Sequence, residues 1–175
     1  MNEDTFWCLI DQARAGSSQV RDQVRALHAL LEPLPPESLQ AFDSYAWSYF
    51  SALDRMELWA AADAIMGGCS DDSFDYFKQW LILQGKPVVL GAVHDPDSLA
   101  DLPLTERPGT EHLLSLARAV YRTKLGHEMP EYASTFRVDK TGWPADRVQD
   151  YKWTEEMTRR LFPRLTAKDA WEQWY

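Results

Sequence analysis

Apolar residues recur three and four positions apart along most of this 175-residue chain, and this spacing limits the fold more than any other feature of the sequence. Residues spaced in this way lie on one face of an α-helix. Phe6, Leu9, Ile10 and Ala13 form the first such face, and comparable rows continue to about residue 125. We therefore predict an all-α fold, an irregular or orthogonal bundle of about seven to nine helices with a long C-terminal loop.

Capping residues predict where several of these helices begin. Ser17 and Ser18 are expected to cap the second helix, because hydroxyl oxygens accept hydrogen bonds from the free N–H groups of a first turn. Thr110 is expected to open a later helix. Thr166 has the spacing of a capping box with the acidic residue three positions on, which predicts a last helix over about 166–174.

The helix predicted over about 71–84 differs from the others, because apolar residues cover much of its circumference. Its two apolar rows are Phe74, Phe77 and Leu81, and Tyr76, Trp80 and Leu83. A helix of this kind usually lies at the centre of its domain. The sequence GGCSDD at 67–72 comes just before it and is expected to end one helix and cap the next.

The length of the chain fits a single helical domain spanning residues 1–175. Within it we predict a helical core over 1–126, a long loop over 127–153 and C-terminal helices over 154–175. The short apolar run at 87–93 is interpreted as a buried helix, since no second strand candidate lies near it.

The net charge of −9 limits the classes of partner. Binding to nucleic acid requires clustered Lys and Arg, so no nucleic acid is expected as a ligand, and an anionic membrane surface is disfavoured for the same reason. A basic protein partner suits an acidic surface. Two cysteines give no disulfide framework, and the acidic start of the chain does not resemble a signal peptide, so we expect a cytoplasmic protein.

The strongest candidate for a functional site in the sequence is the acidic run Asp71, Asp72 and Asp75, which could bind a divalent cation. On a helix, Asp71 and Asp75 share a face, and the pattern is similar to the D-D-x-x-D motif that holds magnesium in helical isoprenoid synthases. Carboxylates in a first turn also offset the helix dipole, and this structural role is the favoured interpretation. Cys69 precedes the same helix, but the neighbouring carboxylates disfavour a thiolate, so we expect a packing residue.

Five further residues are candidate ligand-binding positions. His94 lies beside acidic residues, and His127 is followed by Glu128, so each imidazole has a local acidic partner for acid–base work. Trp80 and Trp143 would line a pocket between the central helix and the 127–152 loop. The histidine spacing matches no zinc motif, and we expect neither a metal nor a cofactor.

Several motifs taken together resemble one known family. They are FWCLIDQAR at 6–14, LWAA at 58–61, GGCSDDSF at 67–74, FKQWLILQG at 77–85 and DPDSLA at 95–100. In this order they resemble an uncharacterised family of small bacterial proteins, rich in actinobacterial members and classed as a domain of unknown function. The resemblance covers about residues 4 to 130. It implies a bacterial, cytosolic, helical domain and carries no activity, cofactor or catalytic residue.

From these observations we expect a non-catalytic binding or regulatory protein, of the adaptor or immunity type, that recognises a basic protein partner through an acidic surface. Two alternatives stay open. One is a small-molecule binding module, and the other is a small enzyme with an Asp/His acid–base or metal site.

Overall fold

The computed structural model describes residues 1–131, 136–148, 150 and 152–167. This part of the chain contains nine α-helices, one 3-10 helix and no strand, so the predicted all-α fold is confirmed. The helices are α1 (Glu3–Arg14), α2 (Val20–Leu31), α3 (Pro36–Ala52), α4 (Met56–Met66), α5 (Asp71–Leu83), α6 (Lys86–His94), η1 (Pro96–Asp101), α7 (Leu113–Leu125), α8 (Glu155–Leu161) and α9 (Pro163–Ala167). None of these described helices combines the length and the apolar character needed to cross a membrane.

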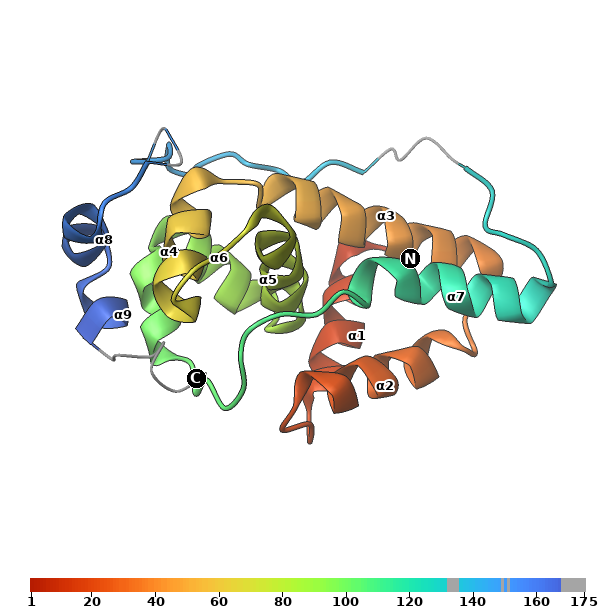
Figure 1. The fold of residues 1–175 in the computed structure, drawn as a ribbon. Coiled ribbons are helices and arrows are strands. Elements are labelled where there is room, and N and C mark those ends of the chain that lie inside the picture. Colours follow the sequence, from red (N-terminus) through yellow and green to blue (C-terminus); the bar gives the residue numbers. More distant parts are fainter. Residues whose placement is uncertain (132–135, 149, 151, 168–175) are drawn as a thin grey trace.

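The helices are arranged in two groups along an elongated molecule (Figure 1). At one end α3 and α7 pack side by side, with α1 and α2 against them. At the other end α4, α6, η1, α8 and α9 lie together. Helix α5 contacts α1, α2, α3, α4, α6 and α7, so it joins the two groups, which confirms its predicted central position.

The core of the α1–α3 group is a cluster of aromatic rings around Phe6. The ring of Phe6 is fully buried, and its centroid lies 5.0 Å from those of Trp7 and Phe42 and 6.0 Å from that of Tyr49. The Tyr49 hydroxyl accepts a hydrogen bond from Trp7 Nε1 (3.3 Å) and donates one to Glu3 Oε1 (2.5 Å). The polar atoms of these rings are therefore satisfied inside an apolar cluster.

A buried lysine lies where α3 meets α5. Lys78 is 4% exposed, and its Nζ lies 2.9 Å from Asp75 Oδ1 and 3.4 Å from Asp54 Oδ1. The same ammonium lies 4.0 Å from the ring centroid of Phe50. Since a buried charge requires partners, this contact assigns the Asp75 carboxylate a structural role.

Four helix starts are capped by a side chain at the residue just before the helix. The capping bonds run from Thr5 N to Asn2, from Ser73 N to Ser70, from Asp97 N to Asp95 and from Met157 N to Thr154. Helix α4 ends at Gly67, which adopts the left-handed conformation with φ 66°. The segment 67–72 is therefore a helix stop followed by a capped start, as predicted.

Three other helices begin away from their predicted starts. Helix α2 begins at Val20 without a local side-chain cap, and Ser17 instead donates its hydroxyl to the carbonyl of Ala13 (2.9 Å). Helix α7 begins at Leu113 rather than at Thr110. Helix α9 begins at Pro163, so Thr166 lies inside it, and the rest of the predicted 166–174 helix lies outside the described residues.

Candidate functional site

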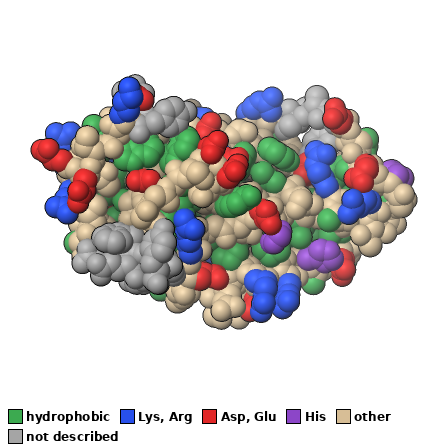
Figure 2. Space-filling model, viewed as in Figure 1, with side chains coloured by type: hydrophobic (Ala, Val, Ile, Leu, Met, Phe, Trp, Pro, Cys, Tyr) green, Lys and Arg blue, Asp and Glu red, His purple; other side chains and the backbone are tan. Residues whose placement is uncertain are grey.

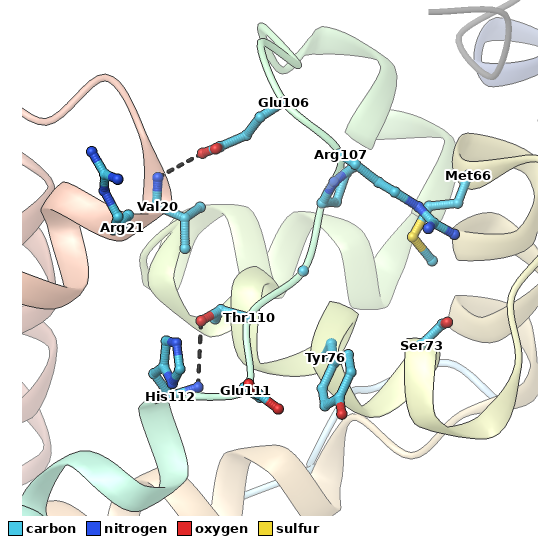
Figure 3. A pocket seen from close by; sticks show the side chains of 12 residues that line it. Val20, Arg21, Met66, Ser73, Tyr76, Glu106, Arg107, Thr110, Glu111 and His112 are labelled. Carbon is cyan, nitrogen blue, oxygen red and sulfur yellow. Dashed lines mark hydrogen bonds between the residues drawn. The ribbon is translucent and has the colours of Figure 1, made fainter. Parts of the chain in front are cut away.

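A groove of about 520 Å³ opens beside the N-terminal half of α5 (Figure 3). It lies between α5, the start of α2 and the non-helical connector 102–112, which joins η1 to α7. Its wall combines apolar, hydroxyl, basic and acidic side chains. They come from Val20, Arg21, Met66, Ser73, Tyr76, Glu106, Arg107, Pro108, Thr110, Glu111 and His112, with the backbone of Gly109.

Two hydrogen bonds fix the connector in place. Glu106 Oε1 accepts the backbone N–H of Val20 (2.6 Å), so a carboxylate from the connector caps the start of α2. Thr110 N donates to the carbonyl oxygen of Tyr76 (3.1 Å) and ties the connector to α5. A Cβ atom built on Gly109 would lie 3.5 Å from that of Tyr76, which shows how closely the connector passes the aromatic residue.

Tyr76 lies at one edge of the groove with 40% of its surface exposed. The negative charge of Glu111 raises the pKa of the Tyr76 phenol, with smaller contributions from Asp72 and Asp75. An exposed aromatic ring on which nearby carboxylates impose a negative potential attracts a cation, because the ring quadrupole and the charges act in the same direction.

The opposite side of the groove has the reverse charge. The guanidinium of Arg107 extends past Met66 toward Ser73, while Glu111 lies beside Tyr76 at the other side of the opening (Figure 3). Glu106 is already bonded to the start of α2. The groove therefore presents a cation-attracting side at Tyr76 and an anion-attracting side at Arg107.

The acidic residues predicted as a ligand site lie at the start of α5. Asp71 and Asp72 are exposed in its first turn, and Asp75 pairs with Lys78. In the part of the chain that the structure describes, no three His, Cys, Asp or Glu side chains are grouped so as to hold a metal ion. Asp72 and Asp75 do act together, since both carboxylates influence Tyr76.

The other predicted site residues are spread over the molecule. Trp80 is 5% exposed and packs on Phe77, whereas His94 is exposed at the end of α6. His127 and Glu128 are exposed after α7, where Nδ1 of His127 lies 3.0 Å from the carbonyl oxygen of Glu128. Trp143 is half-buried in the loop.

Four cavities of about 340–520 Å³ lie among the described residues, and none of them brings the eight predicted site residues together. Each of these cavities is lined by at most one of the eight. Trp80 lines a cavity of about 340 Å³ with the connector, and Trp143 lines none of the four.

The reactivity of the Cys69 thiol can be tested directly. Burial raises the pKa of its thiol to about 12, and the Asp63 carboxylate adds to the increase. The thiol is therefore protonated and unreactive at pH 8. We expect Ellman's reagent to titrate the exposed Cys8 in the folded protein and Cys69 only after denaturation. In the Cys8→Ser variant, a rapid reaction under native conditions would contradict this assignment.

Most of the groove has no recognisable pattern in the sequence. Tyr76 was placed in an apolar row of the central helix, but its side chain is exposed, and this interpretation is corrected. Glu106, Arg107 and Glu111 belong to a connector that contains no helical pattern. The only local signal was the polar run with Pro108 and Gly109, which predicts a loop and gives no indication of the element against which it packs.

Fold and site together define an all-α protein with a buried central helix and an open groove of mixed charge. The chain matches over residues 1–123 the family model described as "Protein of unknown function (DUF4240)", and it belongs to this family. The predicted resemblance to a family of unknown function is thus confirmed. No curated protein matches the chain, and no solved structure matches it.

Proposed function

We propose that the protein is a non-catalytic binding or regulatory protein of the bacterial cytoplasm, of the adaptor or immunity type, and that it recognises a basic protein partner. The observation that carries this proposal is the exposed ring of Tyr76 at the edge of the groove, beside Glu111, whose negative charge makes the largest contribution to the raised pKa of the Tyr76 phenol. A Lys or Arg side chain of the partner would lie against this ring.

A local site is needed because the acidic charge is not concentrated in one large patch on the face shown in Figure 2. Acidic and basic side chains are interspersed there, with hydrophobic side chains visible between them. The net charge of −9 accelerates the approach of a basic partner, and the Tyr76 site supplies contacts that select it. The site and the net charge therefore contribute separately to recognition.

Removal of the ring tests this proposal. We expect a fluorescein-labelled peptide of alternating arginine and glycine to bind the wild-type protein and to bind Tyr76→Ala about two- to fivefold more weakly, which corresponds to one exposed cation–π contact. Tyr76→Phe should retain most of the binding, because the ring remains. The measurement is fluorescence anisotropy at low and high salt.

The matched control is Glu155→Gln, an exposed carboxylate on α8 that pairs with Arg159. Glu111→Gln and Glu155→Gln each remove one negative charge, but only Glu111 lines the groove, whereas Glu155 lies on α8. Equal losses for Glu111→Gln and Glu155→Gln would show that only the overall charge attracts the peptide. Absence of binding by the wild-type protein at low salt would count against the proposal as a whole.

A second candidate function is binding of a small zwitterionic molecule, such as an amino acid, in the groove itself. The specific observation is that Arg107 and Glu111 line opposite sides of a cavity whose volume suits a small ligand. A thermal-shift screen of free amino acids tests this alternative. Stabilisation that is lost in Arg107→Gln would support it, and no stabilisation across the set would remove it.

A further inference from the structure

The part of the chain beyond the family match runs back along the whole molecule. The family match ends at residue 123, close to the end of α7, and the chain then passes over α3 to reach α8 and α9 at the far end (Figure 1). There α9 packs against α4 and η1. We call the described part of residues 136–167, which is 136–148, 150 and 152–167, the return segment, and the surface formed by α4 and η1 the receptor face.

The first contact between them is a buried carboxylate. Glu57, in the first turn of α4, is 4% exposed. Its Oε2 accepts the backbone N–H of Arg147 (2.9 Å), and its Oε1 accepts Nε of the same residue (2.6 Å). Every described hydrogen bond to the Glu57 carboxylate thus comes from the return segment.

A second buried carboxylate of the receptor face is used in the same way. Asp97 is 5% exposed, and its carboxylate accepts the backbone N–H groups of Arg164 (3.1 Å) and Leu165 (2.9 Å) at the start of α9. The half-buried Asp63 bonds to both parts of the chain, because its Oδ1 accepts the backbone N–H of Cys69 (2.9 Å) and its Oδ2 accepts the indole N–H of Trp153 (3.2 Å). Because buried carboxylates are costly without partners, this face is built to be covered by a segment that brings donors.

Apolar anchors complete the contact. Phe162, Leu165 and Val148 of the return segment are buried, and α9, which contains Leu165, packs against α4 and η1 of the receptor face. Nearer the start of the segment, Phe136 places its ring centroid 4.1 Å from that of Tyr45 on α3. The occupant of the receptor face therefore needs basic and N–H donors together with apolar side chains.

The packing between the return segment and the rest of the protein is incomplete. A pocket of about 450 Å³ that opens to the surface is lined by Asp63 and Ala64 of α4 and by Trp153 and Thr158 of the return segment. Another of about 360 Å³ lies between α3 and residues 137–140. The return segment therefore contacts the rest of the protein at separate buried points, with open pockets along the boundary between them.

From these contacts we propose that the receptor face is a docking site for the return segment, and that it accepts this segment from a second copy of the chain as well as from its own. The contacts are the same in both cases. The segment of the same chain competes at an effective concentration of about millimolar, so exchange between copies occurs when that contact is weakened. This inference concerns a different face from the Tyr76 groove and does not depend on the proposed function.

Two complementary full-length variants test the proposal. Glu57→Gln with Asp97→Asn damages the receptor face and leaves the return segment intact. Arg147→Ala with Trp153→Ala damages the return segment and leaves the receptor face intact. We expect each variant alone to be a monomer of 20.2 kDa and an equimolar mixture to form a 1:1 complex of twice that mass. The measurement is light scattering after size-exclusion chromatography, with each chain at about 0.1 mM.

Two arginine substitutions in the return segment test whether the complex forms through the contact between this segment and the receptor face. Arg159 is an exposed arginine of the return segment that pairs with Glu155 inside α8. Adding Arg159→Ala to the receptor-damaged chain should leave the complex intact, whereas adding Arg147→Ala should abolish it. Equal effects of the two changes, or no complex from two chains that are folded by circular dichroism, would overturn the proposal.

The wild-type chain provides a test that does not require the variants to fold. A synthetic peptide of residues 136–167 is added up to millimolar concentration, and hydrogen exchange is followed at the backbone amides of Arg164 and Leu165 in the full-length protein. If the peptide displaces the chain's own segment, exchange of these amides accelerates with peptide concentration. No acceleration at the highest concentration would contradict docking from a second chain.

Discussion

Phe6→Ala is expected to lower the free energy of unfolding by about 3–5 kcal/mol, the usual range for removing a buried phenylalanine ring. Phe6 is fully buried, and its ring contacts those of Trp7, Phe42, Tyr45 and Tyr49. The large rigid rings that contact Phe6 cannot easily move into the space left by its ring, so the cavity persists. The lost free energy of unfolding therefore includes the favourable free energy of burying the ring away from water and the van der Waals contacts that the cavity leaves unmade.

Denaturation by urea measures this loss, with the midpoint expected to fall and the slope to stay unchanged. The matched control is Trp47→Ala, since Trp47 is 43% exposed on α3 and belongs to the same group of helices. We expect the control to cost less than about 1 kcal/mol. Similar losses for the two variants would mean that the aromatic cluster around Phe6 does not form the main core.

The helices whose starts were predicted correctly have their caps in the local sequence. Ser70 illustrates this, because its hydroxyl oxygen accepts the backbone N–H of Ser73 in the first turn of α5. Both partners lie close together in the sequence, so the capping bond can be predicted. Local chemistry of this kind can be predicted from sequence.

The three misplaced starts share a physical cause, because in each case the acceptor comes from a distant part of the chain. Glu106 accepts from Val20 at the start of α2. Gln79 accepts from Leu114 at the start of α7 (3.2 Å), and Asp97 accepts from two residues of α9. The sequence beside these helices holds only weaker alternatives, such as serine and threonine hydroxyls. Tertiary structure overrides them, since a first turn bonds to whichever acceptor the fold brings to it.

The groove was harder to predict than the helices for a related reason. Asp72 and Asp75 were singled out from the sequence, but their effect depends on Tyr76 and Glu111. Glu111 lies 35 positions from Tyr76 and reaches it because Thr110 N bonds to the Tyr76 carbonyl oxygen. That backbone contact has no sequence pattern, so two of the three carboxylates could be predicted and the third, Glu111, could not.

Arg147→Ala is expected to have a large but local effect. Removing the guanidinium leaves Glu57, which is 4% exposed, with the backbone N–H of residue 147 as its remaining donor. Breaking one side of a buried ion pair costs about 3–5 kcal/mol, and the lower end applies because the side chain of Arg147 is half-exposed. The return segment can undock and expose Glu57 to water, so the cost cannot exceed the free energy of docking.

Hydrogen exchange separates this local loss from global unfolding. In Arg147→Ala we expect the amides of Arg164 and Leu165 to exchange about a hundredfold faster, which corresponds to about 3 kcal/mol, while amides in α1 and α3 keep their wild-type rates. Arg159→Ala, which removes an exposed arginine from the same segment, should change neither set. Equal acceleration in α1, α3 and α9 would show instead that residues 136–167 unfold together with the rest of the protein. In that case the receptor face would be part of one cooperative core, and the docking proposal would lose its physical basis.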